Sequence, residues 1–413
     1  MKIKLHYIQP NNYGNLMMAI TFIDNFARNF GGKEELEIVT DVENEKELER
    51  LTDSLETNYN ITMDEKFLKV RARYGRGAKI FKLIVLPFEI LHNIRDYDVH
   101  IVLGGDCISG YYHKARLYAD MIRFKFISKR KRMYLVGQTI GPFSRRGVKI
   151  VRNALKNTVC YTRDNDCYEY CASNMAFRKL EECADLAFLD IPFQSNKEIE
   201  KSLIKKYSLP EEYITIIVSG AYTQYTHDIE KYIDEYVRII ENLINKYHVN
   251  ILMLAHVIHT EDSNDRGVMQ KVYHNLSLEI KDNVCMIDEL VLPYEARILL
   301  GKGLFTITGR MHGAVSSINM GVVPICLSYS VKYKGVIGKC FGLQDYILEC
   351  ADETMWEKHI VSREVCDIVA KLLAKKEEEE RRLKSKLSGV QKKSLKQILE
   401  IIGDLNNAEY ENR

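Results

Sequence analysis

Short apolar runs alternate with amphipathic helical patterns along most of the 413-residue chain. Such alternation is typical of parallel sheets covered by helices, because two parallel strands need a long crossover between them. The first series of candidate strands covers 4–8, 36–40, 100–103, 132–136, 158–162 and 184–188. The second covers 213–219, 250–256, 284–287, 304–308 and 323–328. The pattern predicts an α/β protein with two Rossmann-like domains.

A polar connection that begins at Ile191 separates the two series. We therefore expect an N-terminal domain at 1–190, a second domain at 191–355, and a C-terminal helical segment at 356–413. Within that segment, 372–393 reads as a charged helix whose narrow apolar stripe contains Leu372, Leu383 and Leu387.

Composition indicates a soluble globular protein, with 46% hydrophobic and 28% charged residues. The formal charge of +2 gives no reason to expect nucleic acid as a partner. The ten cysteines are unevenly spaced, which fits reduced thiols in a cytosol. Cys160, Cys167, Cys171 and Cys183 lack the paired Cys-x-x-Cys spacing of a zinc site, so we expect no metal. No apolar run approaches the roughly 20 residues that cross a bilayer, and the first residues read as a strand, not a signal peptide. We expect a cytoplasmic protein.

A cluster of cationic side chains follows the candidate strand 304–308. Arg310 and His312 come directly after the strand, and Lys332 and Lys334 follow the next one. Ligands bind at the carboxyl ends of strands in open α/β sheets, often beside a helix amino terminus. Arginine can hold a carboxylate or phosphate through two parallel hydrogen bonds, and histidine can move a proton near neutral pH. The cluster predicts a site for a small, strongly anionic ligand.

Glycine turns follow three strands of the first series. They contain Asn12, Gly14 and Asn15; Gly104, Gly105 and Asp106; and Gly137, Gln138 and Gly141. Three such turns at one edge of a sheet expose backbone donors, so we interpret them as a binding edge. Arg163, after the strand 158–162, is either a second anion-binding arginine or a structural partner of Asp164.

Five motifs, taken in order, resemble the polysaccharide pyruvyl transferase family. They are Gly137-Gln-Thr-Ile-Gly-Pro-Phe143, Thr162-Arg-Asp164, Ala184-Asp-Leu-Ala-Phe188, Gly309-Arg-Met-His-Gly313 and Tyr329-Ser-Val-Lys-Tyr-Lys-Gly335. The resemblance covers most of 5–340. It implies two domains similar to the glycosyltransferase type B arrangement, and transfer of the enolpyruvyl group of phosphoenolpyruvate to a sugar, usually as a cyclic ketal. No cofactor is implied beyond this donor substrate.

The resemblance also implies roles for single residues. Arg163, Arg310, His312 and Lys332 match the donor-binding positions, and we add Lys334 from the cationic cluster. We expect His312 to be the general acid, Arg310 to hold the donor and Lys332 to hold the departing phosphate. The second domain is the expected donor side. The first is the expected acceptor side, with Asn12, Gly14, Asn15, Gly104, Gly105, Asp106 and Gln138. No general base is evident, and Asp106, Asp164 and His256 are candidates.

The first domain departs from the family at two turns, where this chain has Gly14-Asn15 and Gly104-Gly105-Asp106. The identity of the acceptor sugar is what these departures leave open. Two other functions fit the same architecture: a nucleotide-sugar-dependent glycosyltransferase, and a non-catalytic sugar-binding or assembly protein.

Basic residues gather at 66–82, including Arg71, Arg73 and Arg76, and again at 123–132. The first cluster leads into an apolar run, which is the composition of an interfacial membrane contact. A lipid-linked sugar acceptor would give that contact a purpose. We therefore expect peripheral, salt-sensitive binding at the inner face of the membrane.

Overall fold

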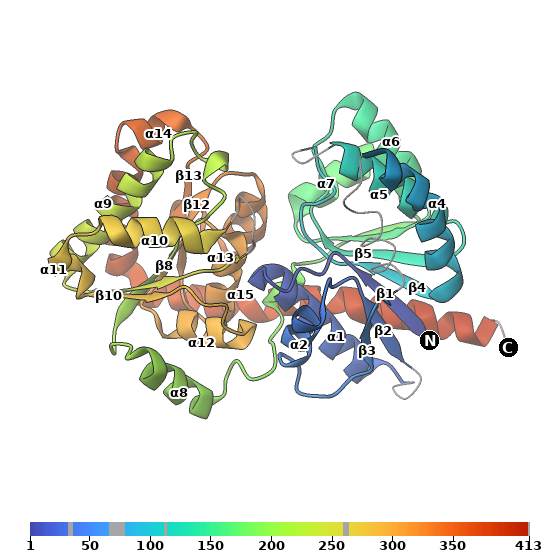
Figure 1. Cartoon of the computed structure of the whole chain (residues 1–413), viewed down its shortest axis with the longest axis horizontal. Coiled ribbons are helices and arrows are strands. Elements are labelled where there is room, and N and C mark those ends of the chain that lie inside the picture. Colours follow the sequence, from blue (N-terminus) through green and yellow to red (C-terminus); the bar gives the residue numbers. More distant parts are fainter. Residues whose placement is uncertain (32–35, 66–78, 111–113, 259–263, 412–413) are drawn as a thin grey trace. The chain divides into compact units, whose positions relative to one another are not determined.

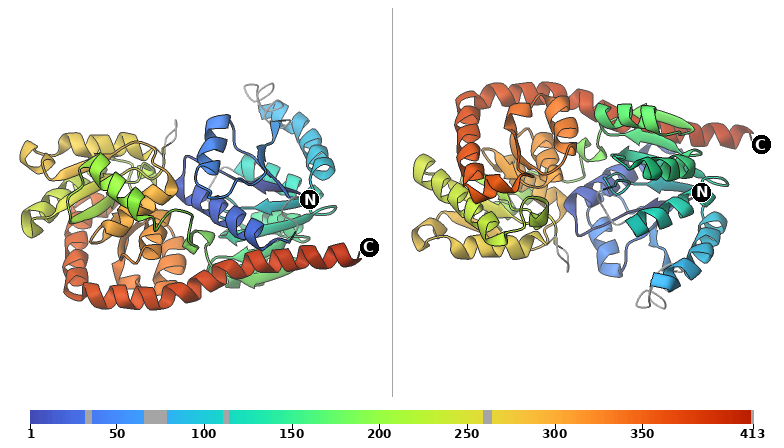
Figure 2. Two further views of the ribbon diagram at one scale, coloured as in Figure 1. Left: turned by 90° about the horizontal axis from the view of Figure 1, so that it is seen from below. Right: turned by 90° about the horizontal axis from the view of Figure 1, so that it is seen from above.

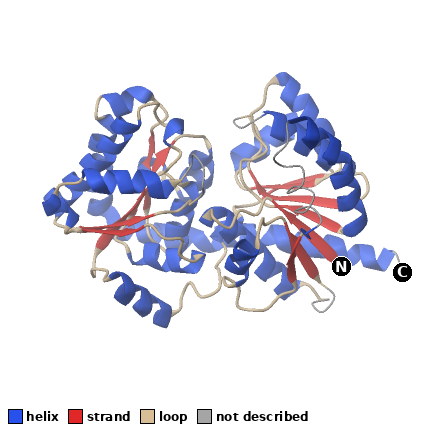
Figure 3. Ribbon diagram, in the orientation of Figure 1, coloured by secondary structure: helices blue, strands red, loops and turns tan. Residues whose placement is uncertain are grey.

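The computed structural model describes residues 1–31, 36–65, 79–110, 114–258 and 264–411. The chain forms two compact units, each containing one sheet with helices packed on it (Figures 1 and 3). Unit 1 comprises 1–10, 15–186 and 391–413, and unit 2 comprises 11–14 and 187–390. All pairings between the named strands are parallel. The predicted α/β class with two parallel-sheet units is confirmed.

Unit 1 has a seven-stranded sheet in the order β3-β2-β1-β4-β5-β6-β7. The strand order reverses between β1 and β4, and open sheets bind ligands beside such a point. The strands are β1 (Lys2–His6), β2 (Glu37–Thr40), β3 (Ile61–Met63), β4 (Val99–Val102), β5 (Arg132–Gln138), β6 (Val159–Thr162) and β7 (Lys179–Glu182). The helices are α1 (Tyr13–Asn29), α2 (Glu45–Thr52), α4 (Lys79–Asp96), α5 (Lys114–Ile127), α6 (Arg145–Leu155) and α7 (Asn165–Asn174).

Helices α4, α5, α6 and α7 cover one face of this sheet, and α1 and α2 cover the other (Figure 1). Between the first group and the sheet lies a core that includes Leu135, Met121 and Phe124. Local sequence sets the helix starts, because Ser144 and Asp164 accept hydrogen bonds from the backbone N–H groups of Gly147 and Cys167. Asp164 is therefore a helix cap.

Unit 2 has a six-stranded sheet in the order β10-β9-β8-β11-β12-β13, with its switch point between β8 and β11. The strands are β8 (Tyr213–Ile217), β9 (Asn250–Leu254), β10 (Val284–Ile287), β11 (Thr306–Thr308), β12 (Pro324–Ser328) and β13 (Ile347–Glu349). The helices are α8 (Lys197–Tyr207), α9 (Ile229–Tyr247), α10 (Asp265–Asn275), α11 (Leu278–Lys281), α12 (Pro293–Lys302), α13 (Met311–Asn319) and α14 (Glu353–Glu357). Helix α9 packs on α10, and α12 packs on α8 and α13.

The C-terminal helix α15 (Ile360–Glu411) is one continuous element (Figure 2). It is far longer than the expected 372–393, and its residues up to Val390 belong to unit 2 while the rest belong to unit 1. In unit 1, Ser394 donates a hydrogen bond to the backbone oxygen of Asp185, and Gln397 bonds the backbone of Gly137 and Ala184. The helix is thus part of both units and not the separate segment that the sequence predicted.

Two sequence predictions of the fold need correction. The expected strand 184–188 is wrong, because Leu186–Phe188 forms a 3-10 turn and the edge strand is β7. Strand β7 reads Lys-Leu-Glu-Glu and is only partly buried at the sheet edge, so it lacks the apolar run that marks the central strands. The units divide between 186 and 187, four residues before the expected boundary.

Candidate functional site

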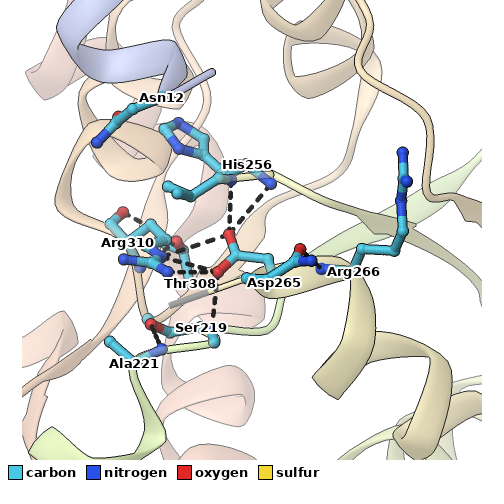
Figure 4. Close-up of polar contacts among 12 residues, drawn as sticks. Asn12, Ser219, Ala221, His256, Asp265, Arg266, Thr308 and Arg310 are labelled. Atoms are coloured by element: carbon cyan, nitrogen blue, oxygen red, sulfur yellow. Dashed lines mark hydrogen bonds and ion pairs between the residues drawn. The ribbon is translucent and has the colours of Figure 1, made fainter. Parts of the chain in front are cut away.

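The candidate site lies in unit 2, around the carboxyl ends of β8, β9 and β11 (Figure 4). Three loops meet there: Ser219–Ala221 after β8, His256–Val257 after β9, and Gly309–Arg310 between β11 and α13. The segment 11–14 joins them, since Asn12 pairs with Val257 in an isolated bridge and Tyr13 donates its backbone N–H to the His256 oxygen.

Arg310 forms a two-pronged ion pair with Asp265 of α10. Its Nε lies 3.0 Å and 3.3 Å from the two carboxylate oxygens, and its Nη2 also bonds Oδ1. The Arg310 side chain keeps 14% of its surface exposed, while Asp265 is fully buried. Burial alone would lower the pKa of Arg310, but the Asp265 carboxylate outweighs it and raises that pKa. The guanidinium therefore stays charged, with its orientation fixed from one edge.

The backbone fixes the Asp265 carboxylate in turn. One oxygen accepts the backbone N–H of Gly220 at 2.7 Å, and the other accepts those of Val257 and His256 at 2.8 Å and 3.2 Å. Gly220 permits this approach, because a Cβ there would lie 2.4 Å from the backbone of Asn264. Asp265 thus ties two loops, those after β8 and β9, to Arg310 of the third.

Sequence reasoning missed Asp265. The only local signal is an Asn264-Asp265 pair ahead of a helical pattern, which usually marks a simple helix start. Asn264 does cap α10, by accepting the Arg266 N–H.

Two buried tyrosines hold the turn that precedes Arg310. The hydroxyls of Tyr225 and Tyr333 donate to the Gly309 oxygen at 2.9 Å and 2.8 Å. Thr308 Oγ1 accepts the Arg310 N–H and donates to the Arg310 oxygen, both at 2.9 Å. The backbone that presents Arg310 is therefore fixed on both sides.

His312 lies in the first turn of α13 and packs against the backbone of Gly14. A Cβ added at Gly14 would stand 2.1 Å from both Cγ and Nδ1 of the imidazole. Although Arg310 and His312 are only two residues apart, they do not share an extended segment that would place both side chains on one face. Arg310 is the N-cap of α13 and His312 is inside the helix.

His256 is a buried imidazole close to Arg310 and His312. It is 1% exposed, and the Tyr13 ring meets it edge-on at 5.2 Å. Burial lowers the pKa of His256 well below its usual value, and His312 and Arg310 lower it further. His256 is thus neutral at pH 7 and is a weak base.

Lys332 belongs to the same unit and lies among tyrosines. Its Nζ is 2.8 Å from the Tyr329 hydroxyl and 5.9 Å from the centre of the Tyr333 ring, whose hydroxyl bonds Gly309. Lys334 instead is exposed and forms an ion pair with Glu349 of β13. Lys334 is thus an exposed residue whose ammonium lies against a carboxylate of the same unit.

Arg163 is a structural residue of unit 1, contrary to the expected donor-binding role. It is 1% exposed, and its Nη1 and Nε bond Asp185 and Thr139 at 2.8 Å and 2.7 Å. The alternative of a structural pair therefore describes Arg163 better, although its partner is Asp185 instead of Asp164.

The expected acceptor residues fall into two groups. Asn12 and Gly14 belong to unit 2, against the loop of His256 and the first turn of α13, and not to the first domain. Asn15, Gly104, Gly105, Asp106 and Gln138 belong to unit 1. Gln138 is buried and bonds the backbone oxygens of Val102 and Leu103, while Asn15 accepts the Gln9 N–H. These hydrogen bonds give Gln138 and Asn15 a structural role. Gly105 and Asp106 are partly exposed.

Over the described residues, one group of side chains has the spacing of metal ligands: Asp234, Glu235 and His359. Glu235 already accepts the Ser362 N–H at 2.6 Å and pairs with His359 at 2.8 Å, so it serves the start of α15. Cys160, Cys167 and Cys171 are buried in the unit 1 core. None of the helices in the described ranges combines the length and apolarity needed to cross a bilayer.

The fold is shared with sugar-nucleotide enzymes. UDP-GlcNAc 2-epimerase from Neisseria meningitidis is 10% identical with a TM-score of 0.59, covering 97% of this chain and 99% of that one. MnaA of S. aureus, in complex with UDP, is 12% identical with a TM-score of 0.59, covering 98% and 96%. ADP-heptose heptosyltransferase II of E. coli is 12% identical with a TM-score of 0.50, covering 91% and 100%. These similarities establish a fold of the glycosyltransferase type B kind.

Sequence comparison gives the family. Among curated proteins none matches the chain. The family model described as polysaccharide pyruvyl transferase matches residues 12–331, which include Gly14, Asp265, Arg310 and His312. Since this match spans most of the chain, the protein belongs to the polysaccharide pyruvyl transferase family, a family of transferases.

Proposed function

We propose that this enzyme transfers the enolpyruvyl group of phosphoenolpyruvate to a pair of hydroxyls on a sugar of a polysaccharide precursor, forming a pyruvate ketal. The observation that carries the proposal is the Arg310 guanidinium, fixed from one edge by Asp265 and followed two residues later by His312. The site thus offers a permanent cation and a proton donor in one helix turn.

Phosphoenolpyruvate carries about three negative charges on one small enol and needs fixed cations. In our proposal Arg310 holds the donor through the guanidinium edge that faces away from Asp265. Lys332 approaches the phosphate, and the tyrosines around it limit the directions its ammonium can take. Arg163 and Lys334 play no part in this proposal.

The chemistry begins with a proton from His312 to the methylene carbon of the donor. The adjacent carbon becomes an oxocarbenium-like centre, which one sugar hydroxyl attacks. The bond from that carbon to the phosphate oxygen then breaks, and the second hydroxyl closes the ring. Two hydroxyl protons are released, one replacing the proton given by His312 and one ending on phosphate, so the atoms balance. A general acid of this kind contributes roughly 10²–10⁴-fold.

The base that accepts the hydroxyl protons has no strong candidate. Asp164 caps α7 and is buried, and burial raises the pKa of its carboxyl group. His256 is a weak base for the reason given above. Asp106, the third residue named from the sequence, belongs to unit 1 and is partly exposed.

Two experiments test the proposal. The first compares phosphoenolpyruvate with UDP by thermal shift, because structural neighbours include enzymes solved with UDP or UDP-GlcNAc. A ligand at 100 times its Kd adds about 2.7 kcal/mol to stability. We expect phosphoenolpyruvate to stabilise the protein and UDP to have no effect; stabilisation by UDP alone would indicate a nucleotide-sugar glycosyltransferase.

The second experiment incubates the enzyme with phosphoenolpyruvate and a panel of free and lipid-linked sugars. Phosphate release should accompany a product that has gained one pyruvate ketal. Tight binding of donor without turnover on any sugar would favour the non-catalytic sugar-binding or assembly protein.

A further inference from the structure

Unit 1 exposes large apolar side chains on two adjacent helices. Of the seven large hydrophobic residues that are exposed in the described part of the chain, four lie on α4 and α5: Phe88, Leu91, Ile122 and Phe126. Phe88 is 66% and Leu91 56% exposed. The two helices pack against each other in the same layer (Figure 1). We call the outer surface of these helices the α4–α5 face.

Both helices carry the same pattern along this face. Phe88, Leu91 and Arg95 follow at i, i+3 and i+7 on α4. Ile122, Phe126 and Lys129 follow at i, i+4 and i+7 along α5 and the residues just after it. Such spacings keep side chains on one side of a helix. Since α4 leads into β4 and α5 into the neighbouring parallel β5, the helices run the same way and their cations lie at the same end.

The acidic side chains of the α4–α5 face, Glu89, Asp96 and Asp120, are at most partly exposed and lie against arginine or histidine side chains. Arg123 binds both Glu89 and Asp120, at 2.7 Å and 2.5 Å, and Asp96 pairs with His92 at 2.7 Å. Arg95, Lys129 and Arg130 are exposed. Within the described ranges they form no ion pair with a carboxylate, and Lys129 instead lies 5.7 Å from the centre of the Phe126 ring.

We propose that the α4–α5 face rests on an anionic membrane surface, with Phe88, Leu91, Ile122 and Phe126 entering the headgroup region. Apolar side chains bordered by unpaired cations are what an interfacial contact requires. A soluble polyanion would use the cations but would have no use for four exposed apolar groups. The proposal stands apart from the pyruvyl transfer proposed above, although it would bring the enzyme to a lipid-linked acceptor.

The basic residues that the structure exposes on this face differ from those expected from the sequence. The basic cluster 66–82 with Arg71, Arg73 and Arg76 lies outside the residues whose side chains are described. The cluster 123–132 is divided, because Arg123 is paired as above and Arg132 donates to the Asp404 oxygen at 2.9 Å. Lys129 and Arg130 are the outward members, and Arg95 joins them from α4.

Vesicle sedimentation of the full chain tests the proposal, with neutral and anionic phosphatidylcholine–phosphatidylserine vesicles at low and moderate salt. We expect binding to anionic vesicles only, weakened by salt. A cation near an anionic leaflet contributes about fivefold, so Arg95→Gln, Lys129→Gln and Arg130→Gln together should weaken binding about 100-fold. Phe88→Ala, Leu91→Ala and Phe126→Ala together should weaken it at least tenfold.

Matched controls lie on other elements. Leu278→Ala and Leu399→Ala remove exposed apolar groups of α11 and α15, and Lys197→Gln and Lys201→Gln remove exposed cations of α8. These variants should bind as the parent does. Equal binding of the apolar triple variant and the parent would overturn the membrane contact. A dimer in sedimentation velocity that the same triple variant dissociates would overturn it too, by assigning the face to a second copy of the chain. Donor turnover in solution should be unchanged throughout.

Discussion

The backbone of Gly14 lies against the imidazole of His312, so closely that a methyl group at Gly14 would stand 2.1 Å from two ring atoms. These residues are at opposite ends of the matched family region, yet both belong to unit 2. The turn that contains Gly14, which we expected on the acceptor side, thus lies directly against the His312 ring.

Gly14→Ala should displace the His312 ring and reduce kcat. A misplacement of about 1 Å can cost about 10²-fold, so we expect a loss of at least tenfold in single-turnover phosphate release. Gly31→Ala is the control, because nothing lies within 4 Å of a Cβ at Gly31. In a His312→Gln background the Gly14→Ala change should have little further effect. Independent, additive losses would show that Gly14 does not act through His312.

His312→Gln retains a hydrogen-bonding side chain of similar reach but removes the exchangeable acid. We expect kcat to fall about 10²-fold or more while donor affinity survives. Phosphate release in a single turnover and donor binding by calorimetry separate the two effects. If affinity fell and the chemical rate did not, His312 would be a binding residue.

Arg310→Lys keeps the positive charge but should still lower kcat/KM for the donor. An ammonium, unlike a guanidinium, cannot bind Asp265 and the donor through two planar edges. Loss of one charge-assisted bond costs about 1.5–3 kcal/mol, so kcat/KM should fall roughly 10- to 150-fold. A kcat/KM within about twofold of the parent would contradict the donor-holding role.

Asp265→Asn should destabilise unit 2 because it leaves the largely buried Arg310 without its counter-charge. Breaking one partner of a buried pair costs about 3–5 kcal/mol. The protein has one tryptophan, Trp356, which is fully buried in unit 2. Its fluorescence during urea unfolding therefore reports on that unit. Glu198→Gln removes an exposed partner of Lys201 and should change stability by under about 0.5 kcal/mol. Similar midpoints for the two variants would contradict the role of Asp265.

The stability of unit 1 should fall with pH below neutrality because two histidines are buried between β1, β4 and α4. Nε2 of His6 is 3.0 Å from Nδ1 of His100, and burial lowers the pKa of His100 to about 3 and that of His6 well below its usual value. The unfolded chain takes up these protons near pH 6.5, whereas the folded chain does not until near pH 3 for His100.

Stability from His100 is therefore complete above about pH 6.5 and declines as pH falls toward 3. The sign follows because the unfolded state binds more protons throughout this window. His100 alone should account for about 2 kcal/mol between pH 7.5 and pH 5. Hydrogen exchange of the β1 and β4 amides measures the effect, and a pH-independent exchange free energy across this range would contradict it.

The sequence predicted elements whose signal is local. Strands β8 and β9 are apolar runs, β1 alternates basic and apolar residues, and the cationic residues after β11 were identified with their strand end. Residues whose role depends on distant partners were not predicted correctly. Asp265 acts through an arginine in another loop, Arg163 is paired with an aspartate beyond the next helix and strand, and Gly14 contacts His312 only in the folded unit. Edge strand β7 was missed because charge pairs with α15, such as Glu181 with Lys396, take the place of an apolar run.

Helix α15 has a consequence for how the protein is made. Unit 1 takes most of its residues from the first 186, but Gln397 supplies the acceptor for the Gly137 N–H and Ser394 the donor for the Asp185 oxygen. These partners leave the ribosome only after all of unit 2 has been synthesised. Unit 1 is therefore the first unit to emerge and the last to complete its hydrogen bonds. A transcript truncated just before codon 391 would yield a protein in which unit 2 has all its residues and unit 1 does not.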